Sequence, residues 1–497
     1  MSVPVFKNQQ LTLTCDAVNE NGDGVCRTPE GFVVFCRGLL PGESAAMRII
    51  KVTSGYAVAR AIGDPDNISP IRRAPACPYA AKGCGGCAFP HITPEGQAKL
   101  ARERVVDCLA RIGGFPEAEI DALTEPCAAP EPSGPQYRNK TVYPFFRVDG
   151  ELRTGFYARA SHRPIAFLPG TPCMHENPVA ARARGTILSE AIKLGYTAYD
   201  ETSAAGLLRH LTLRISDHSG KIMAVVTATR AALPEEKRFI DRVAAALPEL
   251  DSLWLNINRN AGNTILGPDF RLLFGSPTLE CRLRTAVFRI SPASFFQVST
   301  AGAELLYDTV SEFAGLSGGE NVLDLYCGAG TIGLYLANDF RDKAPDAFTR
   351  DPISLTGIEI VPDAVDNARR NAILNSVSGC RFIAGDVPAV IGELPPGSPD
   401  LVIIDPPRKG TDNTLIAALR RLSPARIIYV SCNPATLSRD LKELCADGNY
   451  RLVRIRPVNM FPDTGHVETV CCLYHQKKDF ISVPYEPKDA EYLEQHK

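Results

Sequence analysis

The segment DLYCGAGTIG, residues 324–333, indicates how the C-terminal half of this chain folds. An apolar run ends at Tyr326, and glycines follow at positions 328 and 330 before a second apolar run begins. Glycine lets the backbone turn tightly and approach a ligand closely, so the pattern predicts a loop between a strand and a helix. A single loop of this kind is a weak sign of a ligand, and a plain strand-to-helix turn is the alternative.

The alternation that begins at this loop continues through the C-terminal half. Each strand-like run is followed by a helix-like run: NVLDLY (321–326) by TIGLYLAN (331–338), LTGIEI (355–360) by DAVDNARRNAILN (363–375), DLVIID (400–405) by TLIAALRRL (414–422), and RIIYVS (426–431) by TLSRDLKEL (436–444). Such alternation builds a parallel sheet covered by helices. The sequence therefore predicts a Rossmann-like α/β domain.

Three acidic residues strengthen the case for a ligand at this sheet. Glu359, Asp386 (in the further strand-like run FIAGDV, 382–387) and Asp405 each end a predicted strand, and open parallel sheets bind ligands at the carboxyl ends of their strands. A carboxylate such as that of Glu359 can accept two hydrogen bonds from a ribose diol. The strand–helix series contains one ligand-binding unit of this kind, whereas dinucleotide oxidoreductases contain a second half. The pattern DxxCGxGxxG resembles the loop of S-adenosylmethionine-dependent methyltransferases. That resemblance implies S-adenosylmethionine as the cofactor.

The N-terminal half follows different patterns. Residues 11–60 alternate short apolar runs with turn signals such as NENGDG (19–24), which predicts a small β-barrel. GFVVFCRGLLPGE (31–43) looks like the RNA-binding TRAM module, a barrel of the oligonucleotide-binding (OB) type, and a barrel that only packs is the alternative. Residues 95–112 place Leu100, Val105, Leu109 and Ile112 on one helical stripe. From 125 to about 290 the chain has the mixed pattern of a second domain.

Composition limits the cellular setting and the class of partner. The chain has 497 residues and a formal net charge of -2, so contacts with nucleic acid must come from local basic patches. No apolar run reaches the roughly 20 residues that cross a bilayer, and the first residues show no export signal, so we expect a cytoplasmic protein with no membrane contact. The 16 cysteines then indicate thiols, metal ligands or a nucleophile rather than disulfides.

A cysteine follows the last strand of the alternating series, in IIYVSCNPATLSRD (427–440). Cys432 stands directly after the predicted strand, which places it on the cofactor edge of the sheet, and a helix is predicted to begin just beyond it. A helix N-terminus lowers the pKa of a nearby thiol and makes the thiol more reactive. The alternative role for a free cysteine is that of a small buried apolar residue.

A methyltransferase has a use for such a thiol when its target is C5 of uracil. Addition of a thiolate to C6 gives an enolate whose C5 can attack a methyl group, and a general base must then remove the C5 proton. GHVETVCCLYH (465–475) predicts a strand with His466 and Glu468 on one face, so Glu468 is a candidate base. A solvated glutamate on an edge strand is the alternative.

Several motifs together resemble those of the class I RNA uracil-5-methyltransferases, most closely of the iron-sulfur branch that modifies 23S ribosomal RNA. The matching segments are YRNK (137–140), GFY (155–157), SH (161–162), GLLRH (206–210), SPASFFQV (291–298), DLYCGAGTIG, IDPPRKG (404–410), YVSCNPATLSRD (429–440) and MFPDTGHVETV (460–470). The resemblance implies that Cys432 is the nucleophile and Glu468 the base. It also implies that the residues in contact with S-adenosylmethionine are Gln297, Tyr326, Thr331, Glu359, Asp386 and Asp405.

CPYAAKGCGGC (77–87) brings three further cysteines together. Two residues separate Cys84 from Cys87, a spacing that lets both sulfurs reach one metal centre, although spacing alone does not distinguish iron-sulfur from zinc. Cys77 is the third cysteine of this segment, and Cys173 matches the distant fourth ligand of the family. The resemblance implies a 4Fe-4S cluster on these four thiolates in a structural or RNA-positioning role, with zinc as the main alternative.

The resemblance also implies a division of the chain into parts. We expect a TRAM-like OB barrel over 1–62, a central RNA-binding domain with the cysteine cluster over 63–290, a methyltransferase domain over 291–479 and a tail over 480–497, with the helical region 93–125 able to pack on the catalytic domain. The target uridine has to be flipped out of its stack to reach the pocket. Cations and aromatic residues that could hold RNA are Tyr137, Arg138, Lys140, Phe156, Tyr157, Arg159, His162 and Arg163.

We therefore expect a monomeric enzyme, without an obligate protein partner, that methylates C5 of a single-stranded loop uridine in 23S ribosomal RNA. A transfer-RNA uracil-5-methyltransferase is the first rival, and the cysteine set and the barrel argue against it. An enzyme that methylates amino groups of adenine or cytosine would carry an aromatic residue after DPP, where Arg408 stands. A non-catalytic RNA-binding assembly factor is the last rival, and the presence of both Cys432 and Glu468 argues against it.

Overall fold

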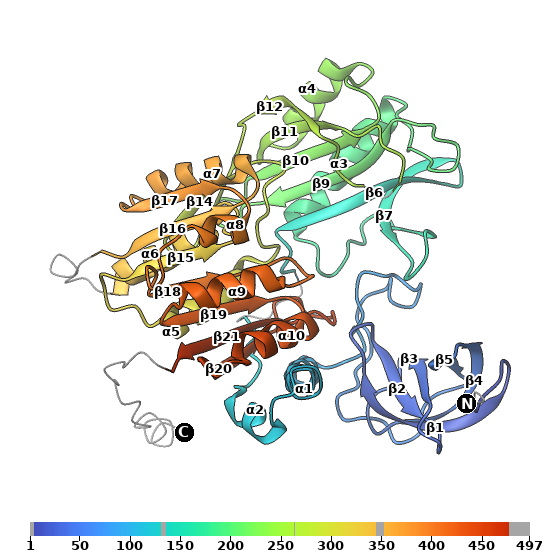
Figure 1. Ribbon diagram of the computed structural model, residues 1–497. Helices are drawn as coiled ribbons and strands as arrows, with labels where there is room; N and C mark the ends of the chain where they lie inside the picture. Colours follow the sequence, from blue (N-terminus) through green and yellow to red (C-terminus); the bar gives the residue numbers. More distant parts are fainter. Residues whose placement is uncertain (1–3, 131–135, 263, 344–351, 477–497) are drawn as a thin grey trace, which may run out of the picture.

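The computed structural model describes residues 4–130, 136–262, 264–343 and 352–476 (Figure 1). The tail predicted over 480–497 lies outside these residues. The chain forms an N-terminal barrel, a mixed α/β body and a C-terminal α/β part, as the sequence predicts. Among the helices of the described residues, none combines the length and the apolar character that a bilayer crossing requires.

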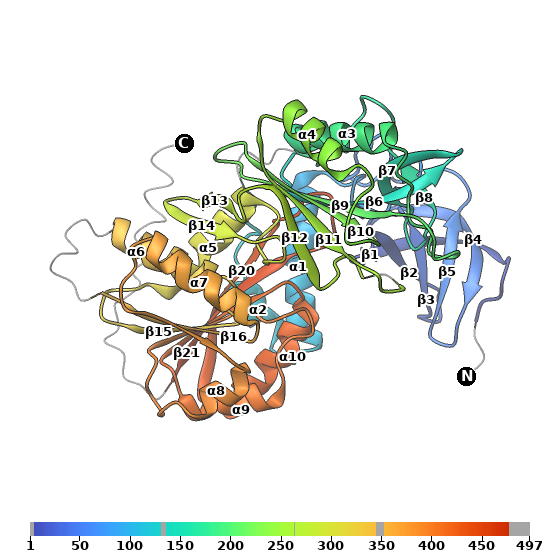
Figure 2. The same ribbon diagram turned by 90° about the horizontal axis from the view of Figure 1, so that it is seen from above.

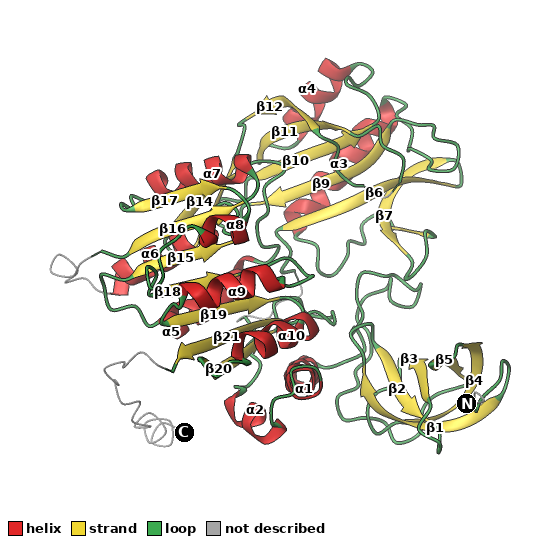
Figure 3. Ribbon diagram, viewed as in Figure 1, coloured by secondary structure: helices red, strands yellow, loops and turns green. Residues whose placement is uncertain are grey.

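The N-terminal barrel is closed by strands in the order β1-β2-β3-β5-β4 (Figure 3). These are β1 (Gln10–Val18), β2 (Asp23–Arg27), β3 (Val33–Arg37), β4 (Ser44–Val52) and β5 (Tyr56–Ala61). Successive side chains point to opposite faces of a strand, and the buried set includes Cys15, Cys26, Cys36 and Met47. The alternating pattern of residues 11–60 thus forms the barrel that the sequence predicts.

A seven-stranded sheet in the order β12-β11-β10-β9-β6-β7-β8 forms the mixed body. Its strands are β6 (Lys140–Val148), β7 (Glu151–Tyr157), β8 (Pro164–Ala166), β9 (Leu208–Ile215), β10 (Ile222–Ala228), β11 (Leu250–Ile257) and β12 (Asp269–Gly275), and its helices are α3 (Pro178–Lys193) and α4 (Glu236–Ala246). Both helices cover one face of this sheet, where Ile187 and Phe239 share a core with Leu211 (Figure 2). Met223 and Val225 of β10 point to the opposite face and join the core of the C-terminal part. The two parts therefore pack directly on one another.

The C-terminal part is a second seven-stranded sheet, in the order β17-β16-β15-β18-β19-β21-β20. Its strands are β15 (Asn321–Leu325), β16 (Ser354–Glu359), β17 (Cys380–Ala384), β18 (Leu401–Ile404), β19 (Arg426–Ser431), β20 (Tyr450–Val458) and β21 (Glu468–His475). Neighbouring strands are parallel except where β21 pairs with β19 and β20. The alternating pattern of the sequence predicted the parallel strands correctly.

Helices cover both faces of this second sheet. One core holds residues of α5 (Thr300–Ala314), α6 (Thr331–Lys343) and α7 (Pro362–Leu374), together with the hairpin of β13 (Leu279–Leu283) and β14 (Ala286–Ile290). The other core holds residues of α8 (Val387–Gly392), α9 (Asn413–Leu422) and α10 (Pro434–Cys445). The loops between strands and helices are thereby left at the carboxyl edge of the sheet.

Helix α1 (Pro94–Arg111), followed by α2 (Glu117–Leu123), lies between the barrel and the C-terminal sheet (Figure 1). The hydroxyl group of Thr93 caps α1 by accepting a hydrogen bond from the backbone N–H of Gly96. Val105 and Leu109 are buried in the core that contains α10 and β20. Ile112, which the sequence places on the same stripe, is 44% exposed because the helix ends at Arg111. That part of the prediction is wrong.

Candidate active site

A cavity of about 1090 Å³ opens at the carboxyl edge of the C-terminal sheet. It is lined by both residues predicted to be catalytic, Cys432 and Glu468, and by five of the six residues predicted to contact the cofactor, namely Gln297, Tyr326, Glu359, Asp386 and Asp405. These residues come from segments as far apart as 297 and 468 in the sequence, so only the folded sheet brings them together. The carboxyl edge of a parallel sheet is where ligands bind in open α/β folds.

The glycine loop between β15 and α6 forms one wall of this cavity. Tyr326, Gly328 and Gly330 have φ angles of 62°, 55° and 76°, in the left-handed region that glycine adopts without steric cost. The backbone N–H of Gly328 donates to Oε2 of Glu359 (3.1 Å), and the N–H of Val361 donates to Oε1 (2.9 Å). The Glu359 carboxylate is therefore held by the backbone, and each oxygen keeps a lone pair for a ligand.

Thr331 is the predicted cofactor residue that does not line the cavity. It is the first residue of α6, and its hydroxyl group lies 3.2 Å from the hydroxyl oxygen of Tyr307 on α5. The side chain therefore joins two helices behind the glycine loop. Asp386, by contrast, caps α8 at the cavity wall by accepting a hydrogen bond from the N–H of Ala389 (3.4 Å).

The pairing of β19 with β21 places the thiol and the carboxylate opposite one another. Ser431 and Thr469 are partners in this antiparallel ladder, so the next residue along each strand is Cys432 on one side and Glu468 on the other. Both side chains line the same cavity. The sequence predicts a strand over 465–475, but β21 begins only at Glu468, and His466 lies in the preceding loop, so the prediction that both share a strand face is wrong.

The surroundings of Cys432 differ from those that the sequence predicts. Burial and the negative charge of Glu468 together raise the pKa of its thiol to about 11, and the positive charge of Arg408 opposes this rise. The pKa is thus raised and not lowered as the sequence predicts, because burial and the charges of Glu468 and Asp405 outweigh the charge of Arg408. Within the cavity, Arg408 is the side chain that most favours the thiolate.

Three carboxyl groups at this edge have raised pKa values. Burial raises the pKa of Glu468 to about 8, with a further contribution from the charge of Asp405. Burial also raises the pKa of Asp405 and of Asp324 to about 7 in each case, although Asp324 accepts a hydrogen bond from the N–H of Gly333 (3.0 Å). A carboxylate with a pKa near the working pH can both accept and release a proton, which suits a general base.

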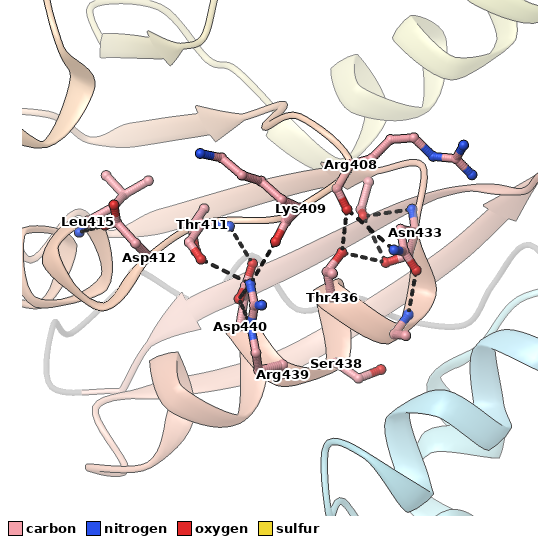
Figure 4. A network of polar contacts seen from close by, with 12 residues as sticks. Arg408, Lys409, Thr411, Asp412, Leu415, Asn433, Thr436, Ser438, Arg439 and Asp440 are labelled. Atoms are coloured by element: carbon pink, nitrogen blue, oxygen red, sulfur yellow. Dashed lines mark hydrogen bonds and ion pairs between the residues drawn. The ribbon is translucent and has the colours of Figure 1, made fainter.

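Residues 405–412, the segment that follows β18, line the cavity. Polar contacts join this segment to α10 and its N-cap residue, Asn433 (Figure 4). The Asn433 amide and the Thr436 hydroxyl group both donate to the carbonyl oxygen of Arg408, at 3.3 Å. The buried carboxylate of Asp440 accepts hydrogen bonds from the Thr411 N–H (2.8 Å) and the Tyr429 hydroxyl group (2.6 Å). These contacts fix the backbone of the segment, and thus the origin of the Arg408 side chain beside Cys432.

The loop between β20 and β21, residues 459–467, forms the opposite wall and carries residues that sequence reasoning did not use. Phe461 and His466 line the cavity, and Nη2 of Arg408 lies 3.3 Å from Nδ1 of His466. Burial and the charge of Arg408 lower the pKa of His466, so the neutral imidazole can accept that hydrogen bond. Phe295, 67% exposed at the rim, was also missed, although its position in SPASFFQV could have indicated it.

A second cavity, of about 420 Å³, lies near the junction of the barrel and the mixed body and is lined by Cys77, Cys84, Cys87 and Cys173. All four thiols are free and half-buried, and burial raises the pKa of Cys87 to about 12 and that of Cys173 to about 11. Four sulfur donors on one cavity suit an iron-sulfur or zinc centre in number and type. In the described ranges, however, no group of three or more Cys, His, Asp or Glu residues is arranged to hold a metal ion.

Known family models match the N-terminal barrel and the C-terminal part of the chain. Residues 4–62 match the TRAM domain, residues 297–426 match the methyltransferase small domain, and residues 393–477 match the model described as tRNA (Uracil-5-)-methyltransferase. The last match contains the segment 405–412, Cys432 and Glu468.

Comparison with whole proteins extends the similarity over nearly the full chain. An "Uncharacterized RNA methyltransferase" of Bacillus cereus is 36% identical over 482 residues, which cover 95% of this chain and 98% of the relative. A relative of the same description from Gloeobacter violaceus is 36% identical over 94% of this chain and 97% of its own length. Among solved structures, the Pyrococcus abyssi tRNA (uracil-54, C5)-methyltransferase in complex with S-adenosyl-L-homocysteine matches with a TM-score of 0.70 and 25% identity, over 93% of this chain and 100% of its own.

Proposed function

This chain belongs to the family of S-adenosylmethionine-dependent RNA (uracil-5-)-methyltransferases, and we propose that it methylates C5 of a specific uridine in 23S ribosomal RNA. The observation that carries the proposed mechanism is the placement of Cys432 and Glu468 opposite one another at the end of the β19–β21 ladder, on the cavity that the glycine loop borders. A thiol and a carboxyl group facing one pocket are the two groups that C5 methylation of uracil needs.

The reaction assigns one step to each group. The Cys432 thiolate adds to C6 of the flipped uracil, which forms the S–C6 bond and makes C5 a carbon nucleophile. S-adenosylmethionine, when bound, supplies the methyl group that C5 takes up. Glu468 then removes the proton from C5, the C5–C6 double bond forms again, and the sulfur leaves as a thiolate. Arg408 favours the charged thiol at the start and at the end of this cycle.

The cavity lining suggests which residues hold the cofactor. We assign this role to Gln297, Tyr326, Glu359, Asp386 and Asp405, with the Glu359 carboxylate as acceptor for ribose hydroxyl groups. Thr331, which lies behind the glycine loop, supports the loop through Tyr307. The four cysteines of the second cavity are proposed to hold a 4Fe-4S cluster, with zinc as the alternative, and the metal centre would stiffen this junction. Analysis of the purified protein for iron, acid-labile sulfide and zinc distinguishes the two.

The RNA substrate has a specific rival. The barrel was expected to argue against transfer RNA, yet the tRNA enzyme of Pyrococcus abyssi covers 93% of this chain, so its match extends into the barrel region. The barrel therefore does not discriminate between the two substrates, and a transfer-RNA uridine is the second candidate. The motifs shared with the iron-sulfur branch support 23S ribosomal RNA as the first candidate. We place the enzyme in the cytoplasm as a monomer that acts on RNA without an obligate protein partner.

The test uses 23S ribosomal RNA and transfer RNA, each transcribed with 5-fluorouridine. Fluorine cannot leave C5 as a proton does, so a covalent enzyme–RNA adduct should persist under denaturing conditions when S-adenosylmethionine is present. We expect an adduct between Cys432 and one uridine of 23S ribosomal RNA, absent in Cys432→Ala and retained in Cys445→Ala, which removes a cysteine at the far end of α10. An adduct with transfer RNA alone would select the second candidate. No adduct with either RNA would refute the enzymatic proposal.

A further inference from the structure

The β20–β21 loop, residues 459–467, is anchored by a buried aspartate. The Asp463 side chain is 3% exposed, and its φ angle of 63° is uncommon for a residue other than glycine. Its Oδ1 atom accepts hydrogen bonds from Nε2 of Gln97 (2.7 Å) and from the Arg73 guanidinium, and its Oδ2 atom accepts one from Nε2 of His175 (3.1 Å). Burial disfavours the Asp463 charge, but these donors outweigh burial and lower its pKa.

The backbone of Asp463 is held as firmly as its side chain. Its N–H donates to Oε1 of Gln97 (2.8 Å), and its carbonyl oxygen accepts a hydrogen bond from the N–H of Phe89 (2.9 Å). A buried group with so many partners has little freedom to move without leaving polar atoms unpaired. Asp463 therefore fixes both the position and the direction of the loop.

The partners of Asp463 all come from outside the C-terminal sheet. Arg73 lies between the barrel and the first cysteine of the second cavity, Phe89 follows Cys87 by two residues, and His175 follows Cys173 by two residues. The anchor thus joins the two cysteine-bearing segments and the segment after the barrel to one loop of the C-terminal part.

The barrel reaches the same loop at a second point. Arg104 of α1 donates to the carbonyl oxygen of Gly465 (2.7 Å) and forms an ion pair with Glu20 in the β1–β2 turn. A Cβ atom on Gly465 would lie 1.9 Å from the carbonyl oxygen of Glu20, so only glycine permits this approach. The loop is therefore clamped between the barrel, α1 and the cysteine-bearing segments.

The far end of the loop leads into the active site. His466 and Phe461 line the catalytic cavity, and β21 begins with Glu468, five residues after Asp463. We infer that Asp463 is a positioning residue that, together with the pairing of β21 in the sheet, sets the place of Glu468, and that it does so through contacts with the barrel-side and cysteine-bearing segments. This inference rests on the proposed function of Glu468 as the base.

The inference predicts a selective defect. Misplacing a catalytic group by about 1 Å can cost on the order of 100-fold in rate, so Asp463→Asn should slow removal of the C5 proton by roughly 10-fold to 100-fold. Addition of Cys432 and methyl transfer use groups of the sheet and of the segment 405–412, which the loop touches at the contact between Arg408 and His466, so these steps should slow less than removal of the proton. With unmodified uridine RNA, the variant should therefore accumulate the methylated covalent adduct, which the wild type resolves quickly.

Single-turnover reactions measure the two steps separately. Formation of S-adenosylhomocysteine reports methyl transfer, and the decay of the denaturant-resistant adduct reports removal of the proton and release of the thiol. Asp121→Asn is the matched control, because Asp121 also forms an ion pair with an arginine but on the exposed helix α2. Arg73→Gln, which removes one partner of Asp463 and leaves the aspartate in place, should show the same defect in weaker form.

Each outcome decides the inference. Two results together would support it. Asp463→Asn should accumulate the adduct, and the double variant Asp463→Asn, Glu468→Gln should remove the C5 proton no more slowly than Glu468→Gln alone. Equal slowing of both steps without accumulation would show a merely structural role and would overturn it, as would rates equal to those of Asp121→Asn. If the wild type forms no adduct with either 5-fluorouridine RNA, the proposed function itself fails, which is a different result.

Discussion

Replacing Glu468 by glutamine should stabilise the folded protein above neutral pH while it removes the proposed base. Burial raises the pKa of this carboxyl group from 4.5 to about 8. Between these two pH values the unfolded chain has released the proton and the folded chain still holds it. Stability therefore falls as the pH rises through this window, because the folded state binds more protons than the unfolded state. Glutamine has no such proton, so the variant escapes this loss.

The size of the effect follows from the shift in pKa. One pKa unit corresponds to 1.36 kcal/mol, so a shift from 4.5 to about 8 corresponds to about 5 kcal/mol at most. The difference in unfolding free energy between Glu468→Gln and the wild type should thus grow with pH by roughly 1.4 kcal/mol per unit and level off above pH 8. In the same window the rate of C5 proton removal by the wild type should rise with pH, because the base must be ionised.

Urea unfolding of both proteins at several pH values between 5 and 9 measures this difference. Other titrating groups are common to the two proteins and cancel in the comparison. Glu443→Gln, on the exposed side of α10, is the control and should show no growing difference. A constant difference between wild type and Glu468→Gln across the whole range would refute the claim that burial holds this carboxyl group protonated.

Three further predictions follow from residues that line the cavity or support its wall. Arg408→Gln removes the charge that lowers the pKa of Cys432, so alkylation of Cys432 by iodoacetamide at fixed pH should slow roughly tenfold. Asp440→Ala leaves the Tyr429 hydroxyl group without its acceptor. Urea unfolding should therefore show that the free energy of unfolding falls by about 1–3 kcal/mol for each buried polar group that loses its partner. Glu359→Gln keeps the shape but loses the charge-assisted hydrogen bonds, so calorimetry should show S-adenosylmethionine binding weakened roughly tenfold, or about 1.4 kcal/mol.

Features of the fold that depend on local periodicity could be predicted from the sequence. The period-two runs before residue 62 formed the barrel, and the strand–helix alternation after residue 320 formed the parallel strands β15, β16, β18 and β19. The ends of helices and strands were harder to predict, because they depend on where the packing against neighbouring elements stops. Ile112 continues the apolar stripe of α1 but is the exposed C-cap residue of the helix, and His466 continues the pattern of β21 but stands in a loop.

Features that depend on distant partners could not be predicted. Asp463 binds Arg73 and His175, which lie 390 and 288 residues away in the sequence, so no local pattern reveals the anchor. The pKa of Cys432 illustrates the same limit. The sequence shows the helix that begins beside the thiol, but the pairing of β19 with β21 is what buries Cys432 against Glu468 and reverses the expected shift.

The two chemical steps are supported by different parts of the chain. Helix α10 holds the segment that carries Arg408, and this support, like Cys432 itself, belongs to the C-terminal sheet. Glu468 also belongs to this sheet, but it follows a loop that Asp463 and Gly465 fasten to the barrel, α1 and the cysteine-bearing segments. Thiol addition is reversible, whereas removal of the C5 proton after methyl transfer releases the product. On the proposed mechanism, the barrel, α1 and the cysteine-bearing segments therefore support the step that commits the adduct to product.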